Sequence, residues 1–113
     1  MPALPIGVLV SGRGSNLQAI LDAVAGESLP VAVRLVVSNQ ADALALERAA
    51  AAGVPTRVIA HRDFVAREAF DAALVAALRE AGAQWVVLAG FMRVLTPTFL
   101  GAFPRRVINI HPA

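Results

Sequence analysis

Two kinds of apolar pattern alternate along the chain. Short, continuously apolar or β-branched runs are typical of strands buried on both faces, and the longer stretches between them have helical spacing. The expected strands are Ile6–Ser11, Val31–Ser38, Thr56–Ala60, Gln84–Ala89 and Val107–Ile110. The expected helices are Asn16–Ala25, Asp42–Ala52 and Asp63–Ala81, with a short one beginning near Thr96–Leu100. This alternation predicts an α/β fold in one domain over residues 1–113, a Rossmann-like parallel sheet with helices on both faces.

Asp42 and Asp63 stand where two of these helices begin, and their carboxylates are suited to accept hydrogen bonds from the first helical N–H groups. We expect both to be N-caps. His61 is expected in a surface turn before a helix, and Trp85 at the start of a strand, where it fills the core.

The amino-acid composition excludes several classes of site and function. The chain has no cysteine, which excludes disulfides, thiolate metal sites and a cysteine nucleophile. It also has no lysine, which excludes Schiff-base chemistry and a Walker phosphate loop. The net charge is only +2, the arginines are scattered and aromatic residues make up 5%, so nucleic-acid binding is disfavoured. No apolar run approaches the roughly 20 residues of a membrane span, and the apolar opening is expected to be a strand rather than a signal peptide. The expected location is cytoplasmic.

The first strand-to-helix junction, Val10–Leu17, carries two glycines and two small polar residues. Such a loop lets backbone N–H groups converge on an anion at a helix N-terminus, so a phosphate fits. A dinucleotide is a poor fit, because Leu17 replaces the third glycine of the fingerprint and no acid ends the second strand. The alternative is a tight turn capped by Ser15 or Asn16.

A second cluster, Leu88–Leu95, follows a predicted central strand and combines glycine, bulky apolar side chains and one cation. This composition suits a flat, partly apolar ligand. The alternative is ordinary core packing by Phe91 and Met92, with Arg93 in solvent.

The last predicted strand ends in Asn109-Ile110-His111-Pro112. Alternating side chains place Asn109 and His111 on one face, roughly 6.6 Å apart, and Ile108 and Ile110 on the other. An amide and an imidazole at the end of a parallel strand are suited to polarise one small oxygen. The alternative is that His111 is structural.

Taken together, these segments closely resemble the folate-dependent formyltransferases, and within them the enzymes that act on glycinamide ribonucleotide. The resemblance covers essentially the whole chain, which corresponds to the N-terminal, nucleotide-binding part of the formyltransferase fold. Its landmarks are Gly12–Ile20, Ser38–Ala43, Leu88–Leu95 and Asn109–Pro112.

The resemblance implies a function and a set of site residues. The implied reaction is formyl transfer from 10-formyltetrahydrofolate, the donor co-substrate, to the amine of glycinamide ribonucleotide in purine biosynthesis, without a metal. The implied catalytic residues are Asn109 and His111. The substrate phosphate would be bound by Gly14, Ser15 and Asn16, and the folate by Arg67, Met92, Arg93, Val94, Leu95 and Asn109.

One departure from the family pattern concerns the aspartate that orients the catalytic histidine from a later loop. No acid follows Glu80, and the earlier Asp42, Asp63 and Asp71 do not match that position. A 113-residue polypeptide by itself is therefore expected to be poorly active. Two alternatives remain, a formyltetrahydrofolate hydrolase and a non-catalytic module that binds a phosphate ligand. The sequence leaves a homo-oligomer open.

Overall fold

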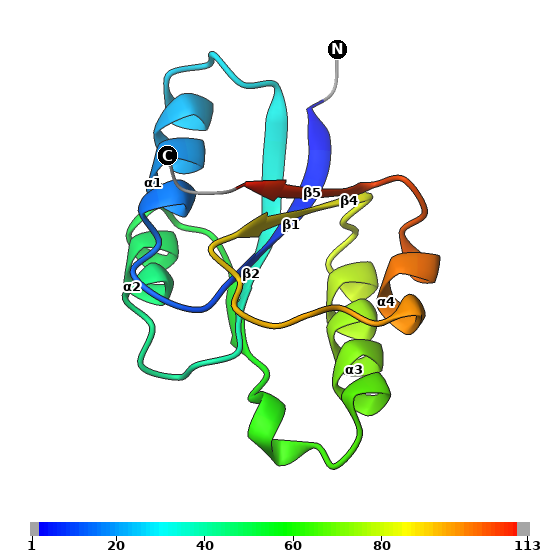
Figure 1. Cartoon of the computed structure of the whole chain (residues 1–113). Helices are drawn as coiled ribbons and strands as arrows, with labels where there is room; N and C mark the ends of the chain where they lie inside the picture. Colours follow the sequence, from blue (N-terminus) through cyan, green and yellow to red (C-terminus); the bar gives the residue numbers. More distant parts are fainter. Residues whose placement is uncertain (1–2, 111–113) are drawn as a thin grey trace.

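Helices and strands alternate along residues 3–110, which the computed structural model describes (Figure 1). The strands are β1 (Leu4–Val10), β2 (Val31–Ser38), β3 (Thr56–Val58), β4 (Trp85–Ala89) and β5 (Val107–Ile110). The helices are α1 (Ser15–Ala25), α2 (Leu44–Ala51), α3 (Arg67–Glu80) and α4 (Pro97–Ala102), with a 3-10 turn at His61–Asp63.

The strands form one parallel sheet in the order β3-β2-β1-β4-β5. The chain moves outward from β1 to β3 and then crosses back to β4 and β5 on the other side of β1. The strand order therefore reverses between β1 and β4, which is where open α/β sheets bind ligands. The predicted Rossmann-like α/β fold is confirmed.

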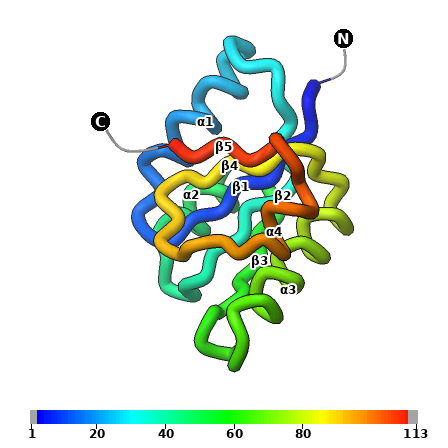
Figure 2. The backbone as a smooth tube through the Cα atoms, turned by 45° about the vertical axis from the view of Figure 1, so that its right-hand side comes forward, coloured from blue at the N-terminus to red at the C-terminus, as the bar shows by residue number. Residues whose placement is uncertain are grey.

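The helices cover the sheet in two layers, with α1 and α2 on one face and α3 and α4 on the other (Figures 1 and 2). The central strands are apolar on both sides because each face has its own core. Val8, Val10 and Val36 pack toward α1 and α2, whereas Leu9 and Val37 pack toward α3. No helix within residues 3–110 is long and apolar enough to cross a membrane.

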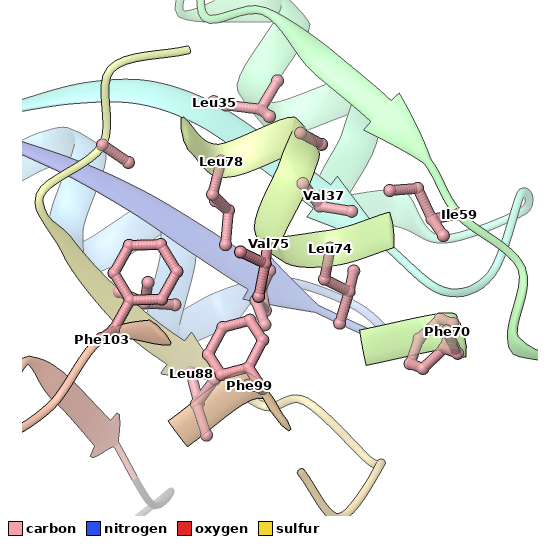
Figure 3. Packing of buried hydrophobic residues seen from close by; sticks show 14 residues of the cluster. Leu35, Val37, Ile59, Phe70, Leu74, Val75, Leu78, Leu88, Phe99 and Phe103 are labelled. Atoms are coloured by element: carbon pink, nitrogen blue, oxygen red, sulfur yellow. The ribbon is translucent and has the colours of Figure 1, made fainter. Parts of the chain in front are cut away.

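Two phenylalanines of α4 and its C-terminal end fix that short helix against α3 (Figure 3). Phe99 is fully buried and Phe103 nearly so, and their ring centroids lie 5.5 Å apart. Burial of one such side chain stabilises the fold by about 1.5–3 kcal/mol. Because α4 is held in this way, the segment between β4 and α4 has two fixed ends.

Gly7 marks the closest approach between the sheet and α3. The β1–β2 register shifts between Ile6 and Gly7. A Cβ atom at position 7 would overlap the Leu78 side chain and lie 3.4 Å from Ala83 Cβ. The absence of a side chain at this position therefore leaves room for the Leu78 side chain against β1.

The edge strands differ from the prediction that strands are buried on both faces. All three residues of β3 are exposed, and β5 is only half-buried, with Ile108 47% exposed. The strand order explains this result, because β3 and β5 are the outer strands of the described sheet.

The predicted N-caps Asp42 and Asp63 are wrong. The N-cap of α2 is Ala43, and the N-cap of α3 is Ala66; neither makes a side-chain capping bond. Asp63 instead ends the 3-10 turn, after which extended backbone at Phe64 delays the helix. The start of α2 is fixed by a tertiary contact, in which Ala45 N donates to Gly12 O at 3.1 Å.

Candidate active site at the carboxyl edge of the sheet

The parallel strands bring the predicted polar segments to one edge. The carboxyl end of β1 leads into residues 11–14, the glycine loop, which contains Gly12 and Gly14. The carboxyl end of β2 leads into Asn39, and that of β4 leads into the segment Gly90–Leu95. Asn109 lies in the last strand, paired with Leu88 of β4. Segments from separate parts of the sequence therefore meet beside the reversal of strand order, as the sequence predicts.

The glycine loop packs against α2 through its backbone. Gly14 is the N-cap of α1 and has a φ of +79°, a conformation that favours glycine. A Cβ atom there would lie 2.6 Å from Ala45 Cβ, so any side chain at position 14 would also clash with α2. Arg48 Nε supports the loop by donating to Arg13 O at 2.7 Å.

No side chain caps α1, so the alternative of a turn capped by Ser15 or Asn16 is wrong in that respect. Both residues already belong to α1, where Ser15 is exposed and Asn16 is half-buried. The first N–H groups of a helix have no partners within it and carry the positive end of its dipole. This loop therefore has the backbone features of an anion-binding site.

A network of hydrogen-bonded polar side chains, buried at Ser11 and Asn39, connects these loops at the carboxyl edge of the sheet. Ser11 Oγ donates to Asn39 Oδ1 at 2.6 Å and accepts from Met92 N at 2.8 Å. Asn39 Nδ2 lies 3.2 Å from His61 Nδ1. His61 thus lies in a turn before a helix, as predicted, and is half-buried and part of this network. Sequence reasoning missed the network; its one available signal is that a small polar residue, Ser11 or Asn39, directly follows each of the strands β1 and β2.

Asn109 and the segment after β4 line one open cavity of about 460 Å³. Met92 and Val94 are 79% and 73% exposed there, so the core-packing alternative is wrong for Met92. Phe91 and Leu95 are partly buried against the core cluster beside α3. The lining comprises Leu88, Phe91, Met92, Arg93, Val94, Leu95, Leu100 and Asn109.

The predicted orientation of the last strand is confirmed for its described residues. Ile108 and Ile110 line an apolar pocket together with residues of β1 and α1. Asn109 lies in the other cavity, with Leu88. The amide side chain is thus exposed on the face where the sequence places the reacting oxygen.

One residue predicted to bind the folate, Arg67, stands apart from this cavity. Arg67 begins α3 and is exposed, and it is not among the residues that line the cavity. His111 lies outside the described residues. Within residues 3–110, no group of three or more His, Asp or Glu side chains is placed to hold a metal ion.

Comparison with known proteins supplies the family. The family model described as formyl transferase matches residues 5–113. The chain belongs to the formyl transferase family. The family match covers every segment of the site described above, including the glycine loop, the segment after β4 and Asn109.

Several relatives of this formyl transferase chain come from purine biosynthesis. Phosphoribosylglycinamide formyltransferase of Escherichia coli (strain K12) is 47% identical over 108 residues, which are 96% of this chain and 51% of that protein. Trifunctional purine biosynthetic protein adenosine-3 of Drosophila pseudoobscura pseudoobscura is 46% identical over 99% of this chain and 8% of that protein.

Solved structures agree with the formyl transferase assignment. Glycinamide ribonucleotide transformylase 1 of Symbiobacterium toebii matches with a TM-score of 0.94 and 47% identity, over 97% of this chain and 52% of that one. The chain therefore spans about half the length of these bacterial relatives.

Proposed function

We propose that the protein containing this chain transfers the formyl group of 10-formyltetrahydrofolate to the amine of glycinamide ribonucleotide. The observation that carries the proposal is the cavity in which the exposed amide of Asn109 faces the segment Phe91–Leu95. The names of the bacterial relatives, at 47% identity, support this acceptor.

The two substrates would lie side by side across the carboxyl edge. In this proposal, the backbone of Gly14, Ser15 and Asn16 binds the phosphate of the acceptor. The donor lies along Met92–Leu95, where the exposed apolar side chains of Met92 and Val94 suit a flat ring system. The contact between Ser11 Oγ and Met92 N, at 2.8 Å, joins the start of one segment to the other and supports a shared site.

In the proposed reaction, the acceptor nitrogen attacks the formyl carbon, a new C–N bond forms, and the bond to the folate nitrogen breaks. Negative charge develops on the formyl oxygen. Asn109 donates a hydrogen bond to that oxygen, and such a donor stabilises a transition state by roughly 3 kcal/mol. His111 is proposed as the second donor and as the group that moves the proton lost by the amine to the departing folate nitrogen.

An acceptor-dependence assay tests the function on the complete protein purified from its source. We expect the formyl-folate to be consumed only when glycinamide ribonucleotide is present, with one formylated acceptor formed per folate released. Mass spectrometry of the products measures both quantities. An intact mass compared with the 11.8 kDa of this chain identifies the polypeptide that is assayed.

The two alternatives give different results in the same assay. Formyl-folate consumption that releases formate without the acceptor would identify a hydrolase. Binding of glycinamide ribonucleotide without any consumption of formyl-folate would identify a non-catalytic module. Either result would overturn the proposed transfer.

A further inference from the structure

The segment Gly90–Leu95 is held at both ends by buried polar side chains from other elements. It has no regular secondary structure, and its outward side chains, Met92 and Val94, are largely exposed. In Figure 1 it leaves β4 and returns to α4 beside α3. A segment with exposed side chains needs its backbone fixed from behind if it is to present a constant surface to a ligand.

Ser11 anchors the upstream end. Its hydroxyl has one proton, which goes to Asn39 Oδ1 at 2.6 Å, and this leaves a lone pair for Met92 N at 2.8 Å. Ser11 is 8% exposed and Asn39 is 2% exposed, so water has little access to these two side chains. The amide of Met92 is therefore tied to the end of β1.

Asp71 anchors the downstream end. Its Oδ2 accepts from Thr96 N at 2.6 Å and from Thr96 Oγ1 at 2.7 Å, and Thr96 is the N-cap of α4. Asp71 is fully buried in α3, and its Oδ1 has no hydrogen-bond partner among the described residues. The ion pair found within residues 3–110 joins Arg57 and Glu80, so no cation of that part of the chain compensates Asp71.

A buried carboxylate without a cation is costly, and an apolar residue would fill the core of α3 at lower cost. What the carboxylate adds is a strong acceptor for both donors of Thr96 at once. We propose that Asp71 is a positioning residue for the formyl donor: through Thr96 it fixes the segment Phe91–Leu95, opposite the anchor at Ser11. This inference rests on the proposed function.

The test compares Asp71→Asn with Thr96→Val in the complete protein. Both variants weaken the anchor while leaving the cavity lining unchanged. We expect KM for formyl-folate to rise about tenfold, since each variant weakens hydrogen bonds to a carboxylate, which are stronger than bonds between neutral groups. KM for glycinamide ribonucleotide should change less than twofold. Hydrogen exchange at the amides of residues 92 and 96, which donate to Ser11 and Asp71, should accelerate, while exchange in β1 and β4 stays slow.

Two controls accompany these variants. Thr96→Ser keeps both donors and is expected to retain the donor KM of the parent protein. Asp63→Asn makes the same chemical change at an exposed carboxylate and should leave both KM values and exchange unchanged. Thr96→Val keeps the test valid if Asp71→Asn does not fold.

The outcomes separate the inference from the function on which it rests. Unchanged exchange at residues 92 and 96 would overturn the anchoring, and faster exchange throughout the sheet would assign Asp71 a general structural role instead. Local acceleration with an unchanged donor KM would show that the segment is anchored but does not bind the donor. Failure of formyl transfer in the parent protein would reject the proposed function before any variant is compared.

Discussion

Replacement of Asn109 by alanine is expected to lower kcat of the complete enzyme by about 10²–10³-fold, the cost of removing one donor to a developing oxyanion. The affinity for glycinamide ribonucleotide should remain within twofold, because the proposed phosphate site is built from the separate glycine loop. Steady-state kinetics with both substrates, together with calorimetric titration of the acceptor, measures the two quantities.

Two further variants identify the lost interaction. Asn109→Asp has nearly the same shape but no amide donor, so its kcat should fall as far as that of the alanine variant. Gln84→Ala removes an exposed amide just before β4, at the opposite edge of the sheet, and should leave kcat unchanged. A kcat within threefold of the parent in Asn109→Ala would contradict the role proposed for this residue.

Gly14→Ala is expected to lower the free energy of unfolding by about 2–5 kcal/mol. The positive φ of +79° accounts for about 1–2 kcal/mol of this loss in an L-residue. The remaining 1–3 kcal/mol or so comes from the clash with Ala45, because overpacking a tight contact forces the backbone to shift. The loop at the start of α1 would be displaced, and acceptor affinity should fall with stability. Urea unfolding of the complete protein measures the change.

Gly53→Ala is the matched control. Gly53 has a φ of +75°, but a Cβ atom there would meet nothing within 4 Å. This variant therefore carries the conformational cost alone, about 1–2 kcal/mol. Equal losses at positions 14 and 53 would show that Ala45 yields freely and that the contact between the glycine loop and α2 is not tight.

The alternation of strands and helices was predictable because it depends on local apolar spacing. Strands β2 and β5 have the bounds that the sequence predicts, and α3 differs only at its ends. The N-caps were not predictable, because the first turn of α2 is placed by Gly12 O and that of α3 by a 3-10 turn. A contact across the fold thus places the start of α2, whereas a local turn places the start of α3.

The residues of the candidate site also fall into two groups, those that the sequence predicts and those that only the fold reveals. The glycine loop, the segment after β4 and Asn109 could be found because each follows or ends an apolar strand. Asp71 could not, because its position in a helical pattern says nothing of its burial or of Thr96 as its partner. Likewise, the sequence does not reveal that Asn39 and His61 meet, since 22 residues separate them.

The close approach between Gly7 and α3 limits which substitutions the fold tolerates at position 7. A side chain at position 7 would require the end of the Leu78 side chain to move, and the same helix, α3, carries Asp71. A substitution at position 7 would therefore cost less in a background where the residue at position 78 had already become smaller. The order in which changes at positions 7 and 78 arise would therefore affect whether each step preserves the packing of the helix that carries Asp71.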